Sequence, residues 1–169
     1  MKLYWSVYLK EVMKNINNLE NMDYLNNISD LISEAKGRVQ INLNSKMVLL
    51  YWNIGKYIRI NIYRDEDKEY GKKIISTLSG DLTDKFGRGY GKSNLFNMIK
   101  FYDEFSNFEI VQTLSGQLNW SHILEILKID DELKCEFYIT MIAHERWSVR
   151  TLKERINSML YENSFIQIT

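Results

Sequence analysis

The loop at residues 87–93 combines three glycines with an arginine and a lysine, a mixture that can hold a phosphate group. Its end, Gly91-Lys92-Ser93, matches the end of a P-loop, where backbone N–H groups, a lysine and a hydroxyl surround phosphates. The match stops there, because Phe86 stands where the first P-loop glycine belongs. The dinucleotide fingerprint fails as well, since its third glycine would fall on Lys92. We therefore expect no nucleotide site and no other cofactor.

Side chains that act as nucleophiles or metal ligands are isolated from one another in the sequence. The two histidines, His122 and His144, and the one cysteine, Cys135, show no pair spacing typical of zinc sites. Acidic runs at 65–67 and 130–132 fit helix starts, where negative charge is favourable. We therefore expect no catalytic residues and no metal, and the chain is not expected to be an enzyme.

Basic and polar residues gather around the same glycine loop in a pattern that predicts a helix-turn-helix. Lysine and arginine bind phosphates, a serine at a helix N-terminus suits a phosphate oxygen, and asparagine can read adenine edges. The alternative interpretation is a plain helical hairpin whose turn is basic. The candidate nucleic-acid contacts are Lys85, Arg88, Tyr90, Lys92, Ser93, Asn94, Asn97 and Lys100.

A second unit of this kind follows, in which residues 113–118 lead through a break at Asn119 into a helix opened by Trp120. Polar side chains at the start of that helix can face a phosphate, although a histidine there can equally bond a backbone carbonyl. Because the surroundings are acidic, these residues rank second as contacts. They are Gln112, Ser115, Gln117, Ser121 and His122.

A net charge of zero conceals two oppositely charged stretches. Residues 36–100 contain 13 basic and 6 acidic residues, a net charge of +7, whereas residues 101–136 contain 2 and 8, a net charge of −6. This asymmetry is typical of a surface that meets a polyanion or an oppositely charged partner. Ordinary solvated helix faces also produce it.

Composition favours one helical domain. The chain has 169 residues, no proline and one cysteine, which predicts an all-α or mainly α fold in a reducing compartment, with the cytoplasm as the expected location. The longest strictly apolar run, at residues 47–52, is far below the ~18 residues of a membrane span. We therefore expect no membrane partner.

Apolar periodicity locates the helices. It predicts them at 39–62, with a weaker extension back to 25, at 74–86, 93–105, 120–129 and 133–143, and from 148 onward. Ser93 is the predicted N-cap of the helix after the glycine loop, and Trp147 with Leu152 predicts a hydrophobic staple around Ser148. Residues 106–119 are expected to be irregular, with a short β-ribbon or wing at 108–114.

Several motifs occur in a recognisable order. They are Tyr51-Trp52-Asn53-Ile54-Gly55-Lys56-Tyr57-Ile58, Tyr70-Gly71-Lys72-Lys73, Asn94-Leu95, Thr113-Leu114-Ser115, Trp120-Ser121-His122 and Trp147-Ser148-Val149-Arg150. Over about residues 25–163 they resemble the N-terminal domain of the YhcG-type bacterial proteins. Gly91 and Asn119 depart from the family pattern, each standing where a serine is expected.

The resemblance implies a helical, winged-helix-like DNA-binding domain that ordinarily precedes a C-terminal PDDEXK nuclease domain. We expect residues 1–24 to be an extension outside this domain, residues 25–163 to form it, and residues 164–169 to be a tail without the nuclease. The leading prediction is a non-catalytic nucleic-acid-binding domain, with DNA as its partner.

The alternative prediction is a protein-interaction module. Such a module could form a homodimer, bind a separately encoded nuclease, or inhibit a nucleic-acid enzyme as a phage counter-defence factor. Its anchors would be the aromatic residues Tyr4, Trp5, Tyr8 and Trp120, because aromatic side chains are enriched at interface hot spots.

Overall fold

The computed structural model describes residues 14, 18, 20–33, 43–64 and 68–166, and every regular element in these ranges is an α-helix. After a helical segment at residues 20–33 come α2 (Leu43–Asn61), α3 (Lys68–Phe86), α4 (Lys92–Glu104), α5 (Phe108–Gln117), α6 (Trp120–Ile126), α7 (Glu132–Glu145), α8 (Val149–Asn157) and α9 (Leu160–Ile166). The prediction of a mainly α fold is confirmed.

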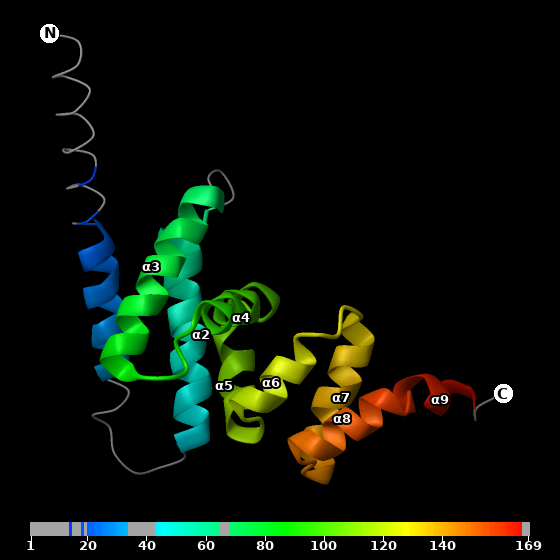
Figure 1. The fold of residues 1–169 in the computed structure, drawn as a ribbon. Coiled ribbons are helices and arrows are strands. Elements are labelled where there is room, and N and C mark those ends of the chain that lie inside the picture. Colours follow the sequence, from blue (N-terminus) through cyan, green and yellow to red (C-terminus); the bar gives the residue numbers. More distant parts are fainter. Residues whose placement is uncertain (1–13, 15–17, 19, 34–42, 65–67, 167–169) are drawn as a thin grey trace, which may run out of the picture.

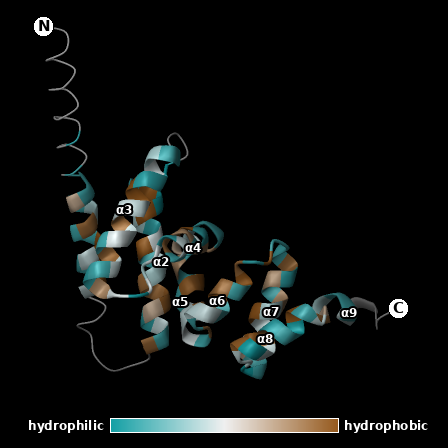
Figure 2. Cartoon of the chain, viewed as in Figure 1, coloured by the Kyte–Doolittle hydropathy of each residue, from teal (hydrophilic) through white to brown (hydrophobic). Residues whose placement is uncertain are grey.

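Helix α2 is the central element, because it contributes to both clusters of buried side chains. Ile54 and Ile58 pack with the 20–33 segment, α3 and α4, whereas Val48 and Trp52 pack with α5, α6, α7 and α8. The two clusters therefore lie on opposite sides of α2, and α4 crosses it (Figure 1). Figure 2 shows hydrophobic residues in brown on α2, α5 and α6, and hydrophilic residues in teal over much of α8.

The predicted helices agree with the structure over most of their length. The pattern at 39–62 corresponds to α2, while its proposed join to the upstream pattern falls partly on residues 34–42, outside the described part of the chain. Helix α3 begins six residues before its predicted start at Ile74. The reason is that its first turns are polar and carry no apolar period, and only Gly71 among them is buried.

The prediction of a β-ribbon at 108–114 is wrong, because these residues belong to α5. The side chain of Asn107 caps this helix by accepting a hydrogen bond from the Glu109 N–H at 2.9 Å. Val111, Leu114 and Ser115 are buried at helical spacing. No strand occurs in the described ranges, so no wing is present there.

The N-termini of α7 and α8 are capped by side chains, at positions where the sequence predicts helix starts. Ser148 caps α8 by accepting a hydrogen bond from the Thr151 N–H at 3.1 Å, with Trp147 and Leu152 packed in the same cluster. Asp131 caps α7 through the Lys134 N–H at 2.8 Å, as expected for an acidic run at a helix start.

Candidate nucleic-acid interface

The turn between α3 and α4 depends on two glycines in the left-handed region of backbone space. Gly87 has φ +86° and Gly89 has φ +122°, values that residues with a Cβ rarely adopt. Arg88 between them is exposed, whereas Tyr90 after them is buried. The turn therefore directs a cation outward and an aromatic ring inward.

The buried side of this turn packs on aromatic rings from three parts of the chain. Tyr51 of α2 meets Tyr90 edge-on at 6.1 Å between ring centroids and Trp120 at 4.8 Å. Burial, together with the neighbouring Tyr51, raises the pKa of Tyr90 to about 12. Tyr90, predicted as a nucleic-acid contact, is instead 4% exposed, and its ring packs on the buried side of the turn.

Asn94 joins the glycine turn to α6. Its amide nitrogen donates to the Gly89 carbonyl, and its amide oxygen accepts from the indole N–H of Trp120 at 3.0 Å. Both ends of the amide are therefore occupied within the protein. Each internal bond uses one N–H or one lone pair of the amide, so a base edge read by Asn94, as predicted, would have to share both groups with these bonds.

The N-terminus of α4 has no side-chain cap. The helix begins at Lys92 with Gly91 as N-cap, so the prediction of Ser93 as N-cap is wrong by two positions. Glycine has no side-chain oxygen to accept from the first N–H groups, and the Lys92 and Ser93 side chains are exposed there. A helix N-terminus carries partial positive charge, which favours an anion such as phosphate.

Three exposed cations lie close to this helix start in the sequence. Lys85, Arg88 and Lys92 form no salt bridge with any described residue. The Lys85 ammonium lies 5.4 Å from the ring centroid of Phe86. The pKa of Glu69 is lowered mainly by Lys72 and also by Lys92, so Glu69 lies within electrostatic reach of Lys92. Cations outside salt bridges can release counterions when they meet phosphates.

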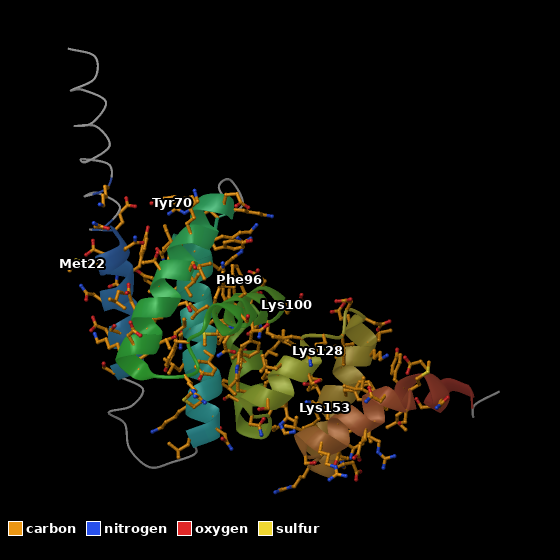
Figure 3. All side chains as sticks on the ribbon, viewed as in Figure 1. Met22, Tyr70, Phe96, Lys100, Lys128 and Lys153 are labelled. Carbon is orange, nitrogen blue, oxygen red and sulfur yellow. The ribbon has the colours of Figure 1, made fainter. Side chains whose placement is uncertain are left out.

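The remaining predicted residues of α4 lie farther along the helix. The Lys100 ammonium donates to the Leu127 carbonyl at 2.6 Å, which ties α4 to the end of α6. Asn97 is half-buried. In Figure 3, Lys100 is labelled near Lys128. The Lys100 ammonium is therefore engaged with the end of α6, and Lys100 is not counted among the cations of the turn.

His122 is part of the internal framework of α6. Its Nδ1 accepts from the Asn119 N–H at 3.3 Å, and Asn119 in turn accepts from the His122 N–H at 3.0 Å, forming a capping box. Because Nδ1 accepts, the proton is on Nε2, which donates to the Trp147 carbonyl at 3.0 Å. Burial lowers the pKa of His122, against the effect of the Trp147 bond. His122 therefore bonds a backbone carbonyl, the second of the two roles expected for it, and its ring is not available to a phosphate.

The other second-rank candidates are scattered. Ser121 is exposed next to Trp120 in a shallow hollow of about 270 Å³ that Tyr51 also lines. Gln112 and Gln117 are exposed on α5, whereas Ser115 is buried and donates to the Gln112 carbonyl at 2.8 Å. Of this group, Ser121 is adjacent to the residues that support the glycine turn.

A pocket of about 900 Å³ lies between α5 and α7, and no motif in the sequence predicts it. Its wall includes Glu104, Asp130, Glu132 and Glu136, which lie up to 32 positions apart along the chain. The net charge of −6 over residues 101–136 indicates an acidic region in the sequence, but it does not show that these four side chains lie around one pocket. Burial and the charges of Glu104, Glu136 and Glu132 raise the pKa of the Cys135 thiol to about 11.

Metal sites and membrane spans are both absent from the described part of the chain. No group of histidine, cysteine, aspartate and glutamate among the described residues could hold a metal ion. None of the described helices combines the length and apolar character that a membrane crossing requires.

Comparison with known proteins places the chain in a family. The family model described as the DUF1016 N-terminal domain matches residues 27–163. The Escherichia coli (strain K12) protein named "Putative nuclease YhcG" is 26% identical over an alignment of 169 positions, which covers 82% of this chain and 45% of that protein, so the chain spans less than half of its relative. No solved structure matches. Since the family model covers most of the chain, this protein belongs to the DUF1016 N-terminal domain family.

Proposed function

We propose that this chain is a non-catalytic nucleic-acid-binding domain that contacts DNA through the turn between α3 and α4. The proposed contact surface, called the turn surface below, consists of Lys85, Arg88, Lys92 and Ser93. The observation that carries the proposal is that three exposed cations, which form no salt bridge with a described residue, lie between the last turn of α3 and the first residue of α4, whose N-terminus has no side-chain cap.

The turn surface fits a phosphate better than a base. Arginine can donate two parallel hydrogen bonds to phosphate oxygens, and lysine adds a point charge. The Ser93 hydroxyl and the first N–H groups of α4 add neutral donors at the positive end of the helix. Asn94, the side chain suited to reading a base, is engaged internally. We therefore expect weak sequence preference and strong salt dependence.

Rigid support strengthens the proposal. The turn lies on Tyr51, Tyr90 and Trp120 and is fastened by Asn94, so Arg88 projects from a fixed backbone. A fixed turn loses little conformational entropy on binding, which favours affinity.

The proposal also rests on the relative. The E. coli protein is named as a nuclease, and this chain aligns with less than half of it. We propose that the domain brings DNA to nuclease activity supplied by another polypeptide segment, and that it works in the cytoplasm, where a lone cysteine is kept reduced. Incubation with duplex DNA and Mg²⁺ or Mn²⁺ should then give no cleavage.

Fluorescence anisotropy tests the binding. The full chain is titrated into labelled duplex DNA, branched DNA and single-stranded RNA at two salt concentrations. Arg88→Ala with Lys92→Ala should weaken binding, because each removed cation leaves one phosphate without its counter-charge. The slope of log affinity against log salt should fall by about 0.9 for each such phosphate.

The matched control removes two exposed cations elsewhere in the molecule. Lys128 and Arg150 pair with Glu125 and Glu154, so Lys128→Ala with Arg150→Ala removes the same charge from other surfaces. A much smaller effect of this control supports the turn surface. Equal effects of both double variants, or no binding of the wild-type chain at low salt, would contradict the proposal.

The protein-interaction alternative is favoured by a different observation, the carboxylate-lined pocket between α5 and α7. Of the aromatic anchors predicted for it, Trp120 packs within the fold between both hydrophobic clusters. Tyr4, Trp5 and Tyr8 lie outside the described residues.

A further inference from the structure

The pocket between α5 and α7, called the acidic pocket below, joins an apolar floor to a carboxylate wall. The apolar side chains come from Phe105 at the end of α4, from α5, from α6 and its connection to α7, and from α7, and they include Ile110, which is 50% exposed. A volume of about 900 Å³ is large enough for several side chains of a bound segment. Exposed apolar surface within a polar rim is typical of an interaction site.

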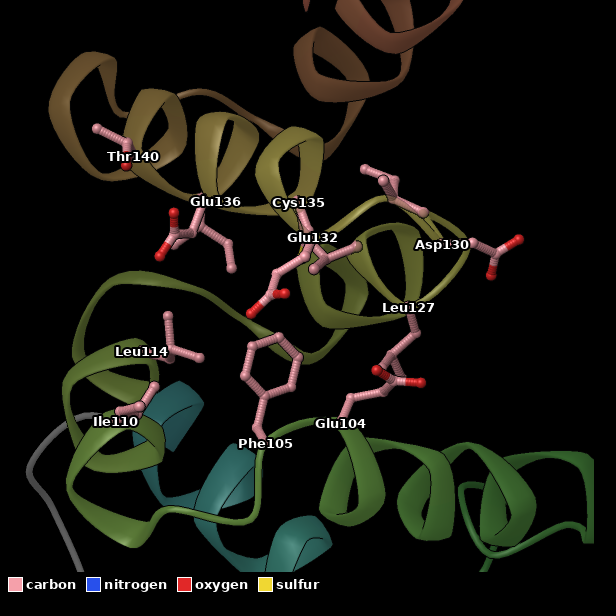
Figure 4. Close-up of a pocket in the computed structure, with 13 residues that line it drawn as sticks. Glu104, Phe105, Ile110, Leu114, Leu127, Asp130, Glu132, Cys135, Glu136 and Thr140 are labelled. Atoms are coloured by element: carbon pink, nitrogen blue, oxygen red, sulfur yellow. The ribbon is translucent and has the colours of Figure 1, made fainter.

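The carboxylates face the apolar floor. Figure 4 shows the Glu132 and Glu136 carboxylates pointing from α7 toward Phe105 and Leu114, whereas Asp130 points away. No lysine, arginine or histidine is among the described residues that line the pocket. Cys135 also lines the pocket, and its pKa is raised first by burial and then by Glu104, Glu136 and Glu132, in agreement with the position of these carboxylates around the apolar floor.

The pocket therefore selects an occupant by its chemistry. It suits a segment that combines large apolar side chains with positive charge, because apolar surface is buried while cations meet the carboxylates. An acidic or phosphorylated ligand would be repelled.

A segment of this chemistry is present in the chain itself. Residues 2–14 contain three lysines and a single acidic residue, and six of the seven residues 3–9 are apolar or aromatic. These residues precede the family match at 27–163, so the matched domain does not include them. The helical segment at 20–33, to which they lead, packs on the first cluster, on the other side of α2 from the acidic pocket (Figure 1).

We propose that the acidic pocket binds residues 2–14 of a second copy of this chain, so that two copies exchange these segments reciprocally. Lys2 and Lys10 of one copy would meet Glu132 and Glu136 of the other, and the aromatic residues between the lysines would cover the apolar floor. The interface is isologous, which closes the assembly at a dimer. This inference is independent of nucleic-acid binding.

Sedimentation equilibrium of the full chain tests the proposal through charge reversal. The wild-type chain should form a dimer whose dissociation constant rises with salt. A pocket variant, Glu132→Lys with Glu136→Lys, and a segment variant, Lys2→Glu with Lys10→Glu, should each weaken self-association at least tenfold, because like charges then face each other at both contacts.

Mixing these two variants gives the decisive measurement. In the mixed dimer the reversed segment meets the reversed pocket, and the unchanged segment meets the unchanged pocket, so both contacts regain opposite charges. The mixture should dimerise with nearly wild-type affinity. Asp81→Lys with Asp84→Lys, on the exposed face of α3, is the control for charge alone and should leave the dimer intact.

Three results would overturn the proposal. The first is a wild-type chain that stays monomeric up to high micromolar concentration, including the case in which its own segment occupies the pocket. The second is a dimer that is insensitive to reversal of the pocket. The third is a mixture that remains monomeric although circular dichroism shows both variants folded.

Discussion

Gly55 of α2 lies directly against the backbone of Met98 of α4. A Cβ added at Gly55 would lie 1.9 Å from the Met98 carbonyl oxygen and 2.4 Å from its carbonyl carbon. Backbone cannot yield as a flexible side chain does, so only glycine permits this approach. The contact sets how closely α4, and with it the turn surface, is held to the central helix.

We predict that Gly55→Ala destabilises the protein by on the order of 3 kcal/mol, because the methyl group forces α4 away from α2. Gly80→Ala is the matched control, since a Cβ there meets nothing within 4 Å and alanine is the better helix former. The control should stabilise the fold by about 0.5–1 kcal/mol. Urea unfolding of both variants measures the contrast, and similar free energies of unfolding would contradict it.

A second prediction concerns the start of α4. Gly91 has φ −61° and ψ 155°, an N-cap conformation open to any residue, and a Cβ there meets nothing within 4 Å. Gly91→Ser should therefore raise the free energy of unfolding by roughly 0.5–1 kcal/mol, by capping the helix and restricting the unfolded chain. Gly87→Ser is the control, because φ +86° should make it destabilising despite equal space. A loss of stability in Gly91→Ser would refute the prediction.

The third prediction tests how Asn94 supports the turn. Asn94→Ala leaves the Gly89 carbonyl and the Trp120 indole N–H without their partners, at a cost of about 1–3 kcal/mol. Amide hydrogen exchange over residues 87–91 should become faster, and DNA affinity should fall although Asn94 is not part of the proposed turn surface. Asn97→Ala, on the same helix and half-buried, should change neither quantity as much. Unchanged exchange in the Asn94 variant would show that the bridge does not hold the turn.

The fourth prediction concerns pH. The pKa of His122 is lowered in the folded protein, mainly by burial, whereas the unfolded chain titrates near 6.5. Below that value the unfolded state binds more protons than the folded state, so stability should fall as the pH is lowered through about 6.5. Above it the full contribution of the neutral imidazole is retained. Chemical unfolding between pH 5 and 8 measures this slope.

His122→Gln separates titration from capping. Glutamine at this position can still accept from the Asn119 N–H, as in other capping boxes, but it does not titrate. The variant should lose the pH slope and also about 1 kcal/mol at neutral pH, from the weakened contact with the Trp147 carbonyl. His144→Gln, on an exposed position of α7, is the matched control substitution. The interpretation fails if the His122 variant keeps that slope.

Local patterns predicted the parts of this fold that local interactions determine. The apolar period of α2 appears in the sequence because neighbours three and four positions apart share a helix face. The turn at the glycine loop and the staple around Ser148 could be predicted for the same reason, since each acts within a few residues. Helix α5 escaped detection because its cap, Asn107, stands in a polar stretch and its buried stripe is only three residues long.

The proposed binding surfaces depend on tertiary structure. Asn94 and Trp120 are 26 positions apart, so nothing in the sequence shows that their hydrogen bond occupies a side chain suited to base reading. Tyr90 and His122 have polar groups of contact type, but burial assigns them to the framework. The acidic pocket likewise forms from Glu104 and from Glu136 on another helix. The sequence by itself determined the helices and the charged stretches, and only packing decided which side chains face solvent, because burial depends on contacts between distant segments.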